Sequence, residues 1–294
     1  MRISTPQMWR SSINDVSRAQ VASAEAGKRV STGRRIDRAS DDPVGALRAT
    51  QLRTDADAID QYHRAAQDAV TVMNEQDTAL QSVLNRMIEV EGLTISSAND
   101  VQTVDGREAI ATELEELRAQ LVDIANTDHR GRALFGGFNG AAVDASAPTV
   151  ALSSDGGAVL RRVDENHVVQ INVDAGEVFG FSSGRSLFDV LDDIIIDVRA
   201  ADVATLGTTR LDELESARTN VSNALGTIGA RTSRVQTTIT HSTERRDTNR
   251  AAAASIDEVD LAQASIDVSE AALAYEAALA ITAQINRTSL LNFL

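Results

Sequence analysis

The chain has 294 residues, of which 43% are hydrophobic and only 3% aromatic, and its formal net charge is −15. Its hydrophobic residues are therefore mostly aliphatic, which suits long helices packed along narrow seams better than a thick globular core. The acidity argues against a nucleic-acid partner, because phosphate binding depends on clustered cations. The chain has no cysteine, which excludes disulfides and thiolate chemistry.

The two ends of the chain carry opposite charges. Residues 1–40 hold eight arginine or lysine residues against three acids, and residues 255–294 hold one arginine against six acids, so the net charges are +5 and −5. Opposite charges favour association of the two ends and disfavour self-pairing of either. Both stretches also place apolar residues at helical spacing, which predicts a hairpin-shaped chain with a helix at each end.

The N-terminus shows no targeting segment. Residues 1–7 lack the apolar core of a secretory signal. No run approaches the roughly 18 apolar residues that would span a bilayer. By these rules alone, we expect the protein in the cytoplasm, without membrane insertion.

A helix boundary is predicted near residue 40. Ser31-Thr32-Gly33 is expected to end the first helix. After it, Asp41 and Asp42 offer an acidic N-cap, and Pro43 occupies a first helical position, where its missing N–H costs nothing. We therefore expect Asp41, Asp42 and Pro43 to form a hinge between a terminal helix and a rod. Capping also explains the acid pair better than a Ca²⁺ site, because no alternating Asp/Asn loop follows.

Four stretches then repeat apolar residues at alternating spacings of four and three, the signature of coiled-coil packing. They cover residues 52–87, 110–124, 187–198 and 211–239. A helix from Pro43 to Glu91 would be on the order of 70 Å long. Turn residues between Leu93 and Gly106 mark its end.

The composition changes between about residues 136 and 184, where eight of the seventeen glycines lie. Four short β-like runs occur there, at residues 149–152, 158–160, 168–173 and 178–181. Turn residues at 155–157 and 174–176 separate them, which predicts hairpins. The predicted fold is therefore mainly α: a long coiled-coil helical hairpin or bundle with paired terminal helices and a small β insertion at the tip.

Several strings resemble the flagellin superfamily. They are Val30–Pro43 (VSTGRRIDRASDDP), Met1–Thr5 (MRIST), Arg132–Phe138 (RALFGGF) and Ala283–Leu294 (AQINRTSLLNFL). The Ser-Asp-Asp-Pro form and the opening residues are more similar to members that join hook to filament than to filament flagellins. The resemblance covers about residues 1–140 and 185–294, and the insertion matches only in position and type.

The resemblance implies a structural subunit at the hook–filament junction of the bacterial flagellum, outside the cell. Such a subunit is exported unfolded, with a chaperone, through the flagellar type III apparatus and without a cleaved signal, which reverses the cytoplasmic expectation. Its expected partners are further copies of itself in a ring or helical assembly, a neighbouring hook-associated protein and flagellin. No enzyme activity, cofactor, metal or nucleic acid is implied.

Five segments follow from this interpretation. They are the N-terminal helix of the inner assembly region (1–42), the outgoing rod (43–138), the outer insertion (139–184), the returning rod (185–252) and the C-terminal helix (253–294). The expected assembly interface lies on the terminal helices and consists of Ile3, Met8, Ile13, Val16, Leu261, Val268, Tyr275, Leu279, Ile285 and Leu290. Apolar residues off this stripe, such as Ile266, Leu273 and Ile281, call for neighbouring subunits. Because an isolated terminal pair buries little apolar area, we expect both ends to fold only on assembly.

Other polar motifs have plain structural explanations. His63 and Asp77 fall on the rod seam, where a polar residue fixes helix register more often than it binds metal. Residues 136–140 are glycine-rich but lack a following Lys-Ser/Thr, which favours a helix C-cap over a phosphate loop. The Asp192–Asp193 pair is expected to be solvated. The four histidines lie in different elements, with no nucleophile motif beside them.

Three other functions stay open at this point. Filament flagellin is the nearest, and the Ser-Asp-Asp-Pro motif argues against it. A coiled-coil signalling rod would need a ligand domain at its tip, and an insertion of about 45 residues is small for one. A secreted enzyme is the most distant alternative, because no catalytic constellation appears.

Overall fold

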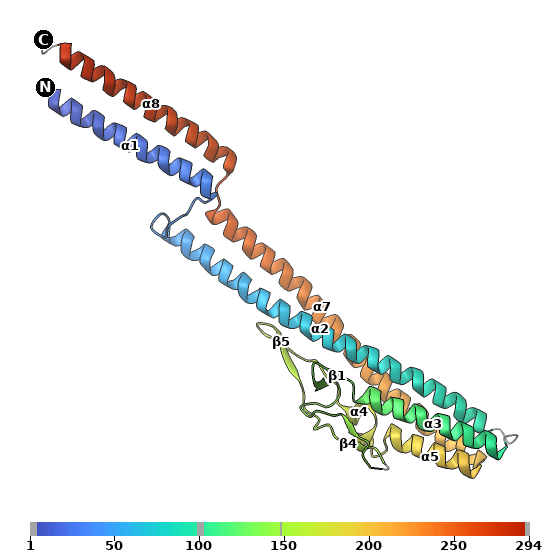
Figure 1. Cartoon of the computed structure of the whole chain (residues 1–294). Helices are drawn as coiled ribbons and strands as arrows, with labels where there is room; N and C mark the ends of the chain where they lie inside the picture. Colours follow the sequence, from blue (N-terminus) through green and yellow to red (C-terminus); the bar gives the residue numbers. More distant parts are fainter. Residues whose placement is uncertain (1–4, 99–102, 148, 292–294) are drawn as a thin grey trace. The chain divides into compact units, whose positions relative to one another are not determined.

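The computed structural model describes residues 5–98, 103–147 and 149–291. The chain divides into two compact units: one takes in the chain up to Ala58 and again from Arg245, and the other runs from Ile59 to Glu244. Within the described residues, long helices dominate (Figure 1). The prediction of a mainly α fold with a small β region is confirmed.

The long helices are α1 (Thr5–Thr32), α2 (Pro43–Ser97), α3 (Val104–Ala125), α5 (Leu187–Ala200), α7 (Leu211–Asp257) and α8 (Leu261–Leu291). Short helical turns separate some of them: α4 (Ala175–Val178), the 3₁₀ turn η1 (Phe181–Ser183), α6 (Val203–Thr205) and the π-helical turn η2 (Leu206–Arg210). The predicted break between residues 93 and 106 is present, because α2 ends at Ser97 and α3 begins at Val104.

The strands form three small antiparallel pairs. They are β1 (Asp128–His129) with β2 (Arg132–Ala133), β3 (Val143–Asp144) with β4 (Ala151–Leu152), and β5 (Leu160–Asp164) with β6 (His167–Gln170). In the first pair Asp128 lies opposite Ala133, and in the third Leu160 lies opposite Gln170. Each pair is too small to be stable alone, so the strands depend on the helices they pack against.

Two sequence predictions for this region are wrong. Residues 178–181 end α4 and begin η1 rather than forming a strand. The Asp174 carboxylate accepts a hydrogen bond from the Gly176 N–H at 3.0 Å and caps α4, so the turn residues begin a helix there. The glycine-rich segment 136–140 is not a helix C-cap, because α3 has already ended at Ala125 and β2 precedes the glycines.

The core of the second unit is one continuous cluster contributed by α2, α3, α5, α7 and the segments around the strands. Along α2 the fully buried positions follow a strict alternation of three and four residues, namely Ala66, Ala69, Met73, Gln76, Leu80, Val83, Met87 and Val90. The spacing of four and three within residues 52–87 predicts eleven seam positions, and six of them are buried: Ala56, Ile59, Ala66, Met73, Leu80 and Met87. Asp77, however, lies on the surface side, where its Oδ2 accepts a hydrogen bond from Gln81 Nε2 at 2.6 Å.

Helix α5 buries seven of its fourteen residues in this core. Ser186 begins it with a capping box, in which Ser186 Oγ accepts from the Asp189 N–H and Asp189 Oδ2 accepts from the Ser186 N–H. Phe188 contacts Phe179, with the two ring centroids 5.6 Å apart. These contacts fix α5 against the segment that follows the strands.

The Asp192–Asp193 pair is ion-paired rather than solvated, which corrects the sequence prediction. Asp192 Oδ1 lies 2.6 Å from Arg118 Nε on α3. Asp193 pairs with Arg185, and its Oδ2 lies 3.2 Å from Arg210 Nη1. Both acids therefore hold neighbouring elements together.

In the first unit, α1 and α8 pack against each other along their length. They run antiparallel, with the two ends of the chain on the same side of the pair (Figure 1). The predicted pairing of the terminal helices is therefore present. The division into five segments stays a prediction.

Candidate assembly surface

Small side chains make the contact between α1 and α8. The least exposed side chains on α1 recur at alternating spacings of four and three: Ser12, Val16, Ala19, Ser23, Ala26 and Val30. Those on α8 do the same: Ala264, Val268, Ala271, Tyr275, Ala278 and Thr282. This is coiled-coil spacing with mostly small residues, which lets the backbones approach closely but buries little apolar area.

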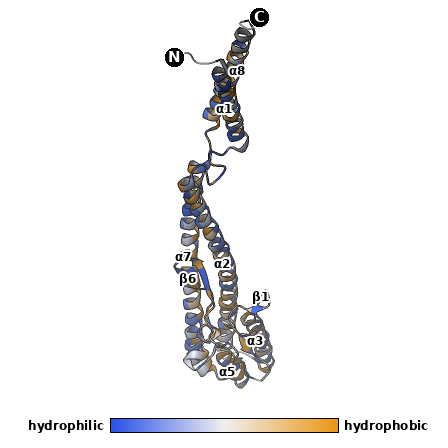
Figure 2. Ribbon diagram, turned by 90° about the vertical axis from the view of Figure 1, so that its left-hand side faces the viewer, coloured by the Kyte–Doolittle hydropathy of each residue, from blue (hydrophilic) through white to orange (hydrophobic). Residues whose placement is uncertain are grey.

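Larger apolar side chains on these helices stay exposed outside this contact. On α1 they are Trp9, Ile13 and Val21; on α8 they are Leu261, Ile266, Leu273, Leu279 and Ile281. Trp9 is 48% exposed and Leu273 is 67% exposed. Figure 2 shows hydrophobic and hydrophilic residues interspersed along both helices. Soluble monomers rarely keep this many large apolar side chains in water on so narrow a pair of helices, so they indicate a surface that another chain covers.

The predicted interface residues fall into three groups. Val16, Val268 and Tyr275 are half-buried and face the partner helix of the same chain. Ile13, Leu261 and Leu279 are exposed. Ile3 lies outside the described residues, and so do the side chains of Met8, Ile285 and Leu290.

Two linkers lie side by side between the helices of this unit. One connects α1 to α2, and the other connects α7 to α8. Arg34 and Glu258 form an isolated antiparallel bridge between them. The Arg35 N–H donates to Asp257 O at 2.7 Å, and the Val259 N–H donates to Gly33 O at 3.0 Å. The linkers therefore hold each other through backbone hydrogen bonds.

Arg35 and Arg53 strengthen this junction, and neither role is visible in the sequence pattern. Arg35 Nε and Nη2 both donate to Ile256 O, at 3.0 and 2.6 Å. Arg53 pairs with the buried carboxylate of Asp257 at the end of α7. Burying a carboxylate without a cation costs free energy, so Asp257 can be buried here because Arg53 pairs with it.

Asp42 caps α2, as the sequence predicts. Its Oδ1 accepts a hydrogen bond from the Gly45 N–H at 2.8 Å, and this bond lowers the pKa of Asp42 from its ordinary value. Asp41 has a different role. Its Oδ2 accepts a hydrogen bond from the Arg38 N–H at 2.9 Å, which stabilises a turn in the linker between α1 and α2. The hinge function of these residues stays a prediction.

Gly45 is a position that the sequence reasoning missed. A Cβ at Gly45 would lie 2.8 Å from Asp42 Cγ and 2.9 Å from Ile36 Cδ1, both too close for van der Waals contact. The absence of a side chain here lets the capping carboxylate and the buried Ile36 pack against the first turn of α2. A small residue next to an Asp-Pro cap is the signal that could have indicated this.

Cations gather at the end of α1 and in the linker that follows. A cavity of about 440 Å³ there is lined by Lys28, Arg29, Arg34, Arg35 and Arg38, together with three acids. Lys28 pairs with Asp37, and Arg35 pairs with Asp42. The guanidinium groups of the other three arginines form no ion pair or hydrogen bond with the described residues. We call Arg29, Arg34 and Arg38 the basic cluster.

The opposite charges of the two ends form no ion pair with each other in the part of the chain that the structure describes. Among the described residues, no ion pair links α1 to α8, and those that α1 makes are local, such as Arg18 with Asp15. On α8, Glu270 and Glu276 are exposed, and their carboxylates have no partner among the described residues. The opposite net charges of +5 and −5 are therefore available for contacts with other chains.

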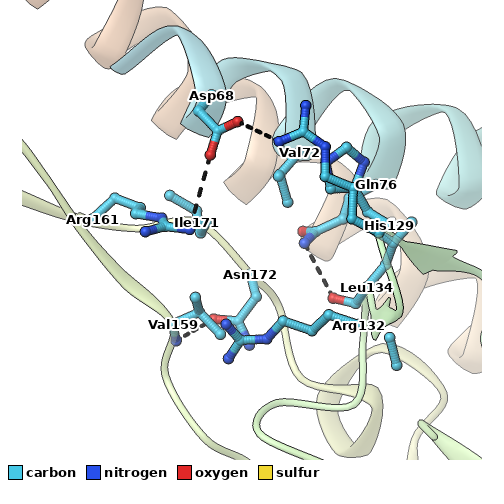
Figure 3. Close-up of a pocket in the computed structure, with 12 residues that line it drawn as sticks. Asp68, Val72, Gln76, His129, Arg132, Leu134, Val159, Arg161, Ile171 and Asn172 are labelled. Atoms are coloured by element: carbon cyan, nitrogen blue, oxygen red, sulfur yellow. Dashed lines mark hydrogen bonds and ion pairs between the residues drawn. The ribbon is translucent and has the colours of Figure 1, made fainter. Parts of the chain in front are cut away.

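A smaller cavity, of about 200 Å³, lies in the second unit beside α2 and the β1–β2 hairpin (Figure 3). Its arginines already have partners within the chain: Asp68 pairs with Arg130 at 3.3 Å and with Arg161 at 3.9 Å, and Arg132 Nη2 donates to Gly137 O at 3.2 Å. Gln76 Nε2 donates to Leu134 O at 3.1 Å, while Gln76 Oε1 is buried and has no hydrogen-bond partner among the described residues. These contacts hold the hairpin on α2, so we assign no ligand to this cavity.

Neither a metal centre nor a membrane segment emerges from the described residues. No group of three or more histidine or acidic side chains in the described ranges could hold a metal ion. His63 is half-buried on α2, and His129 Nδ1 lies 2.7 Å from Glu75 Oε2. No helix in the described part of the chain has the length and hydropathy that a membrane crossing requires.

Comparisons with known proteins connect these features to a family. The model of the bacterial flagellin N-terminal helical region matches residues 3–140, and that of the bacterial flagellin C-terminal helical region matches residues 211–294. Flagellar hook-associated protein 3 of Salmonella typhimurium is 27% identical over 208 residues, which span 66% of each chain. The Escherichia coli K12 protein of the same name is 24% identical over 243 residues, or 78% of this chain and 77% of its own length.

A solved structure shows the same fold. The flagellar junction protein FlgL from Legionella pneumophila superposes with a TM-score of 0.62 at 14% identity. The match covers 72% of this chain and all of that chain. At this identity the likeness concerns the fold alone.

Proposed function

The chain belongs to the bacterial flagellin family, and from this premise we propose that it is the subunit that joins the hook to the filament. The family consists of structural proteins, so the chain is a structural component of the bacterial flagellum and not an enzyme. Two relatives carry the name flagellar hook-associated protein 3, which favours the junction over the filament as its position.

The exposed apolar residues of α1 and α8 support this proposal most directly. Eight large apolar side chains of these two helices face water: Trp9, Ile13, Val21, Leu261, Ile266, Leu273, Leu279 and Ile281. An apolar surface is stabilised when another chain removes it from water, by about 25 cal/mol per Å² buried. A self-assembling subunit needs such a surface, whereas an isolated rod would be destabilised by it.

The proposal also covers the subunit's binding partners and its path to the junction. We expect the subunit to assemble with copies of itself and with the neighbouring hook-associated protein and flagellin, through the terminal helices. We also expect it to reach the junction outside the cell, unfolded and with a chaperone, through the flagellar type III apparatus. In this proposal, residues 1–42 and 253–294 form the inner assembly region, and residues 139–184 face outward.

A deletion strain tests the proposal. A strain that lacks this gene is expected to form hooks but no attached filaments, and to release flagellin into the medium. Expression of the full-length chain should restore filaments. Filaments attached to hooks in the deletion strain would contradict a junction role.

Filament flagellin is the second candidate, because the two family models describe flagellin regions. The two relatives named flagellar hook-associated protein 3 and the Ser-Asp-Asp-Pro sequence at residues 40–43 favour the junction instead. A signalling rod and a secreted enzyme are not favoured, because the family is structural.

A further inference from the structure

Glu270 occupies an unusual place on α8. It lies four residues after Ile266 and three residues before Leu273, so the three side chains share one face of the helix. Both apolar neighbours are exposed, and this face points away from the contact with α1. A carboxylate therefore stands in the middle of the apolar face that the proposed assembly would cover.

Covering this face with another chain would remove the Glu270 carboxylate from water. Desolvation of an unpaired carboxylate is costly, and it is offset only when a cation with good hydrogen-bond geometry replaces the lost water. Glu270 has no such cation among the described residues of its own chain, where it forms no ion pair with α1 or any other element. The cation must therefore come from the covering chain.

The basic cluster is suited to supply that cation. Arg29, Arg34 and Arg38 line part of the cavity of about 440 Å³, beside Asp37, which already pairs with Lys28. Their guanidinium groups form no ion pair with the described residues, although the charges of Arg34 and Arg38 help to lower the pKa of Asp37. Arginine binds carboxylates through two parallel hydrogen bonds, which fixes geometry as well as charge. The basic cluster is also a local concentration of positive charge in a chain whose net charge is −15, so an acidic surface of another copy would be attracted to it.

We propose that the basic cluster of one copy binds the Glu270 carboxylate of a neighbouring copy. The proposal rests on the proposed function, because it specifies the charged contact within the self-assembly surface. Such a contact is heterologous, meaning that two different patches meet, and contacts of this kind generate rings or helical arrays. It would also fix which part of α8 meets which neighbour, since a misplaced Glu270 would stay unpaired.

Charge reversal in living cells is the first test. In the deletion strain, the variant Arg34→Glu/Arg38→Glu and the variant Glu270→Arg, each expressed alone, should reduce the number of filamented cells at least tenfold. Expressed together they should restore filaments, because each variant keeps the partner patch that the other needs. Glu276→Arg is the matched control: Glu276 is also exposed on α8 and has no ion pair among the described residues, but it lies six residues after Glu270, about 120° around and about 9 Å along the helix from it. This variant should behave as wild type.

Cross-linking is the second test. The chain has no cysteine, so an introduced cysteine is the only thiol that can react. Differently tagged Arg34→Cys and Glu270→Cys chains are co-expressed, and intact flagella are treated with a short bis-maleimide. A covalent dimer carrying both tags is expected, and Arg34→Cys with Glu276→Cys should give at least tenfold less. Circular dichroism of each purified variant confirms that it still folds.

The outcomes separate this contact from the proposed function. If the charge-reversed variants each support filaments alone, and no mixed dimer forms although both chains are in the flagella, the contact is wrong and the junction role stands. If Glu270→Cys cross-links only to a different flagellar protein, the partner is not a second copy and the proposal is overturned. If the wild-type chain is absent from flagella, the proposed function itself fails.

Discussion

Asp42, Gly45 and Arg35 determine the local structure where α1 gives way to α2. Asp42 caps α2, Gly45 leaves room for the cap, and Arg35 ties the linker to Ile256 O across the junction. The cap could be predicted from sequence, because Asp-Pro at a helix start has a local cause. The role of Arg35 could not, because its partner lies 221 residues further along the chain.

Replacement of Asp42 tests the cap. Asp42→Ala should lower the midpoint of thermal unfolding, because the Gly45 N–H loses its acceptor, whereas Asp42→Asn should keep most of the cap. Circular dichroism at 222 nm measures both. Equal midpoints for wild type and Asp42→Ala would show that α2 does not depend on this cap.

The same residue predicts a pH dependence. The Gly45 N–H holds the pKa of Asp42 below its ordinary value of 3.8, so the folded state favours the charged form. A lowered pKa contributes stability that is present above pH 3.8 and is lost as the pH falls through the folded value. The difference in midpoint between wild type and Asp42→Asn should therefore change below about pH 4, because position 42 titrates in the wild type and not in the variant. Between pH 5 and 8 the difference should stay constant. Thermal scans across this range measure the difference, and a constant difference down to pH 2 would contradict the assigned hydrogen bond.

At the scale of elements, the apolar periodicity predicted helices well and their exact faces less well. On α2, Ala66, Met73, Leu80 and Met87 were assigned to the core and are buried there. Gln76 was missed, because a glutamine is buried only when a distant partner satisfies it, and that partner is Leu134 O. On α1 and α8 more than half of the contact residues are alanines and serines, whose weak hydrophobicity makes the seam hard to see in an apolar pattern.

Helix α5 offers a matched pair of positions for testing the core. Phe188 is fully buried, whereas Ile196 on the same helix is 61% exposed. Phe188→Ala should destabilise the second unit by about 3–5 kcal/mol, since it removes transfer energy and leaves a cavity. Ile196→Ala should change stability by less than about 0.5 kcal/mol. Chemical denaturation measures both, and similar effects at the two positions would contradict the described core.

At the scale of the whole molecule, the helices α1 and α8 are paired, but their contact adds little free energy of folding. The seam between α1 and α8 is made mostly of small side chains, and ordering each residue costs roughly 1–2 kcal/mol of backbone entropy. The apolar gain from one narrow contact barely offsets this cost. The structure shows the arrangement that the two helices adopt when folded, and burial by neighbouring chains would supply the missing stability.

Hydrogen exchange on dilute monomer checks this expectation. Amides in residues 5–30 and 260–290 should exchange much faster than those of α5 and of the buried part of α2, because the terminal pair opens without the rest. Protection should appear on assembly. Strong protection of both ends in the monomer would show that folding is not coupled to assembly.

The central claim is that this member of the flagellin family sits at the junction of hook and filament. Electron microscopy of intact flagella, with gold-labelled antibody raised against the purified chain, measures its position directly. A single narrow band of label where the hook meets the filament is the expected result. Label along the whole filament would contradict the claim and identify the chain as a filament flagellin.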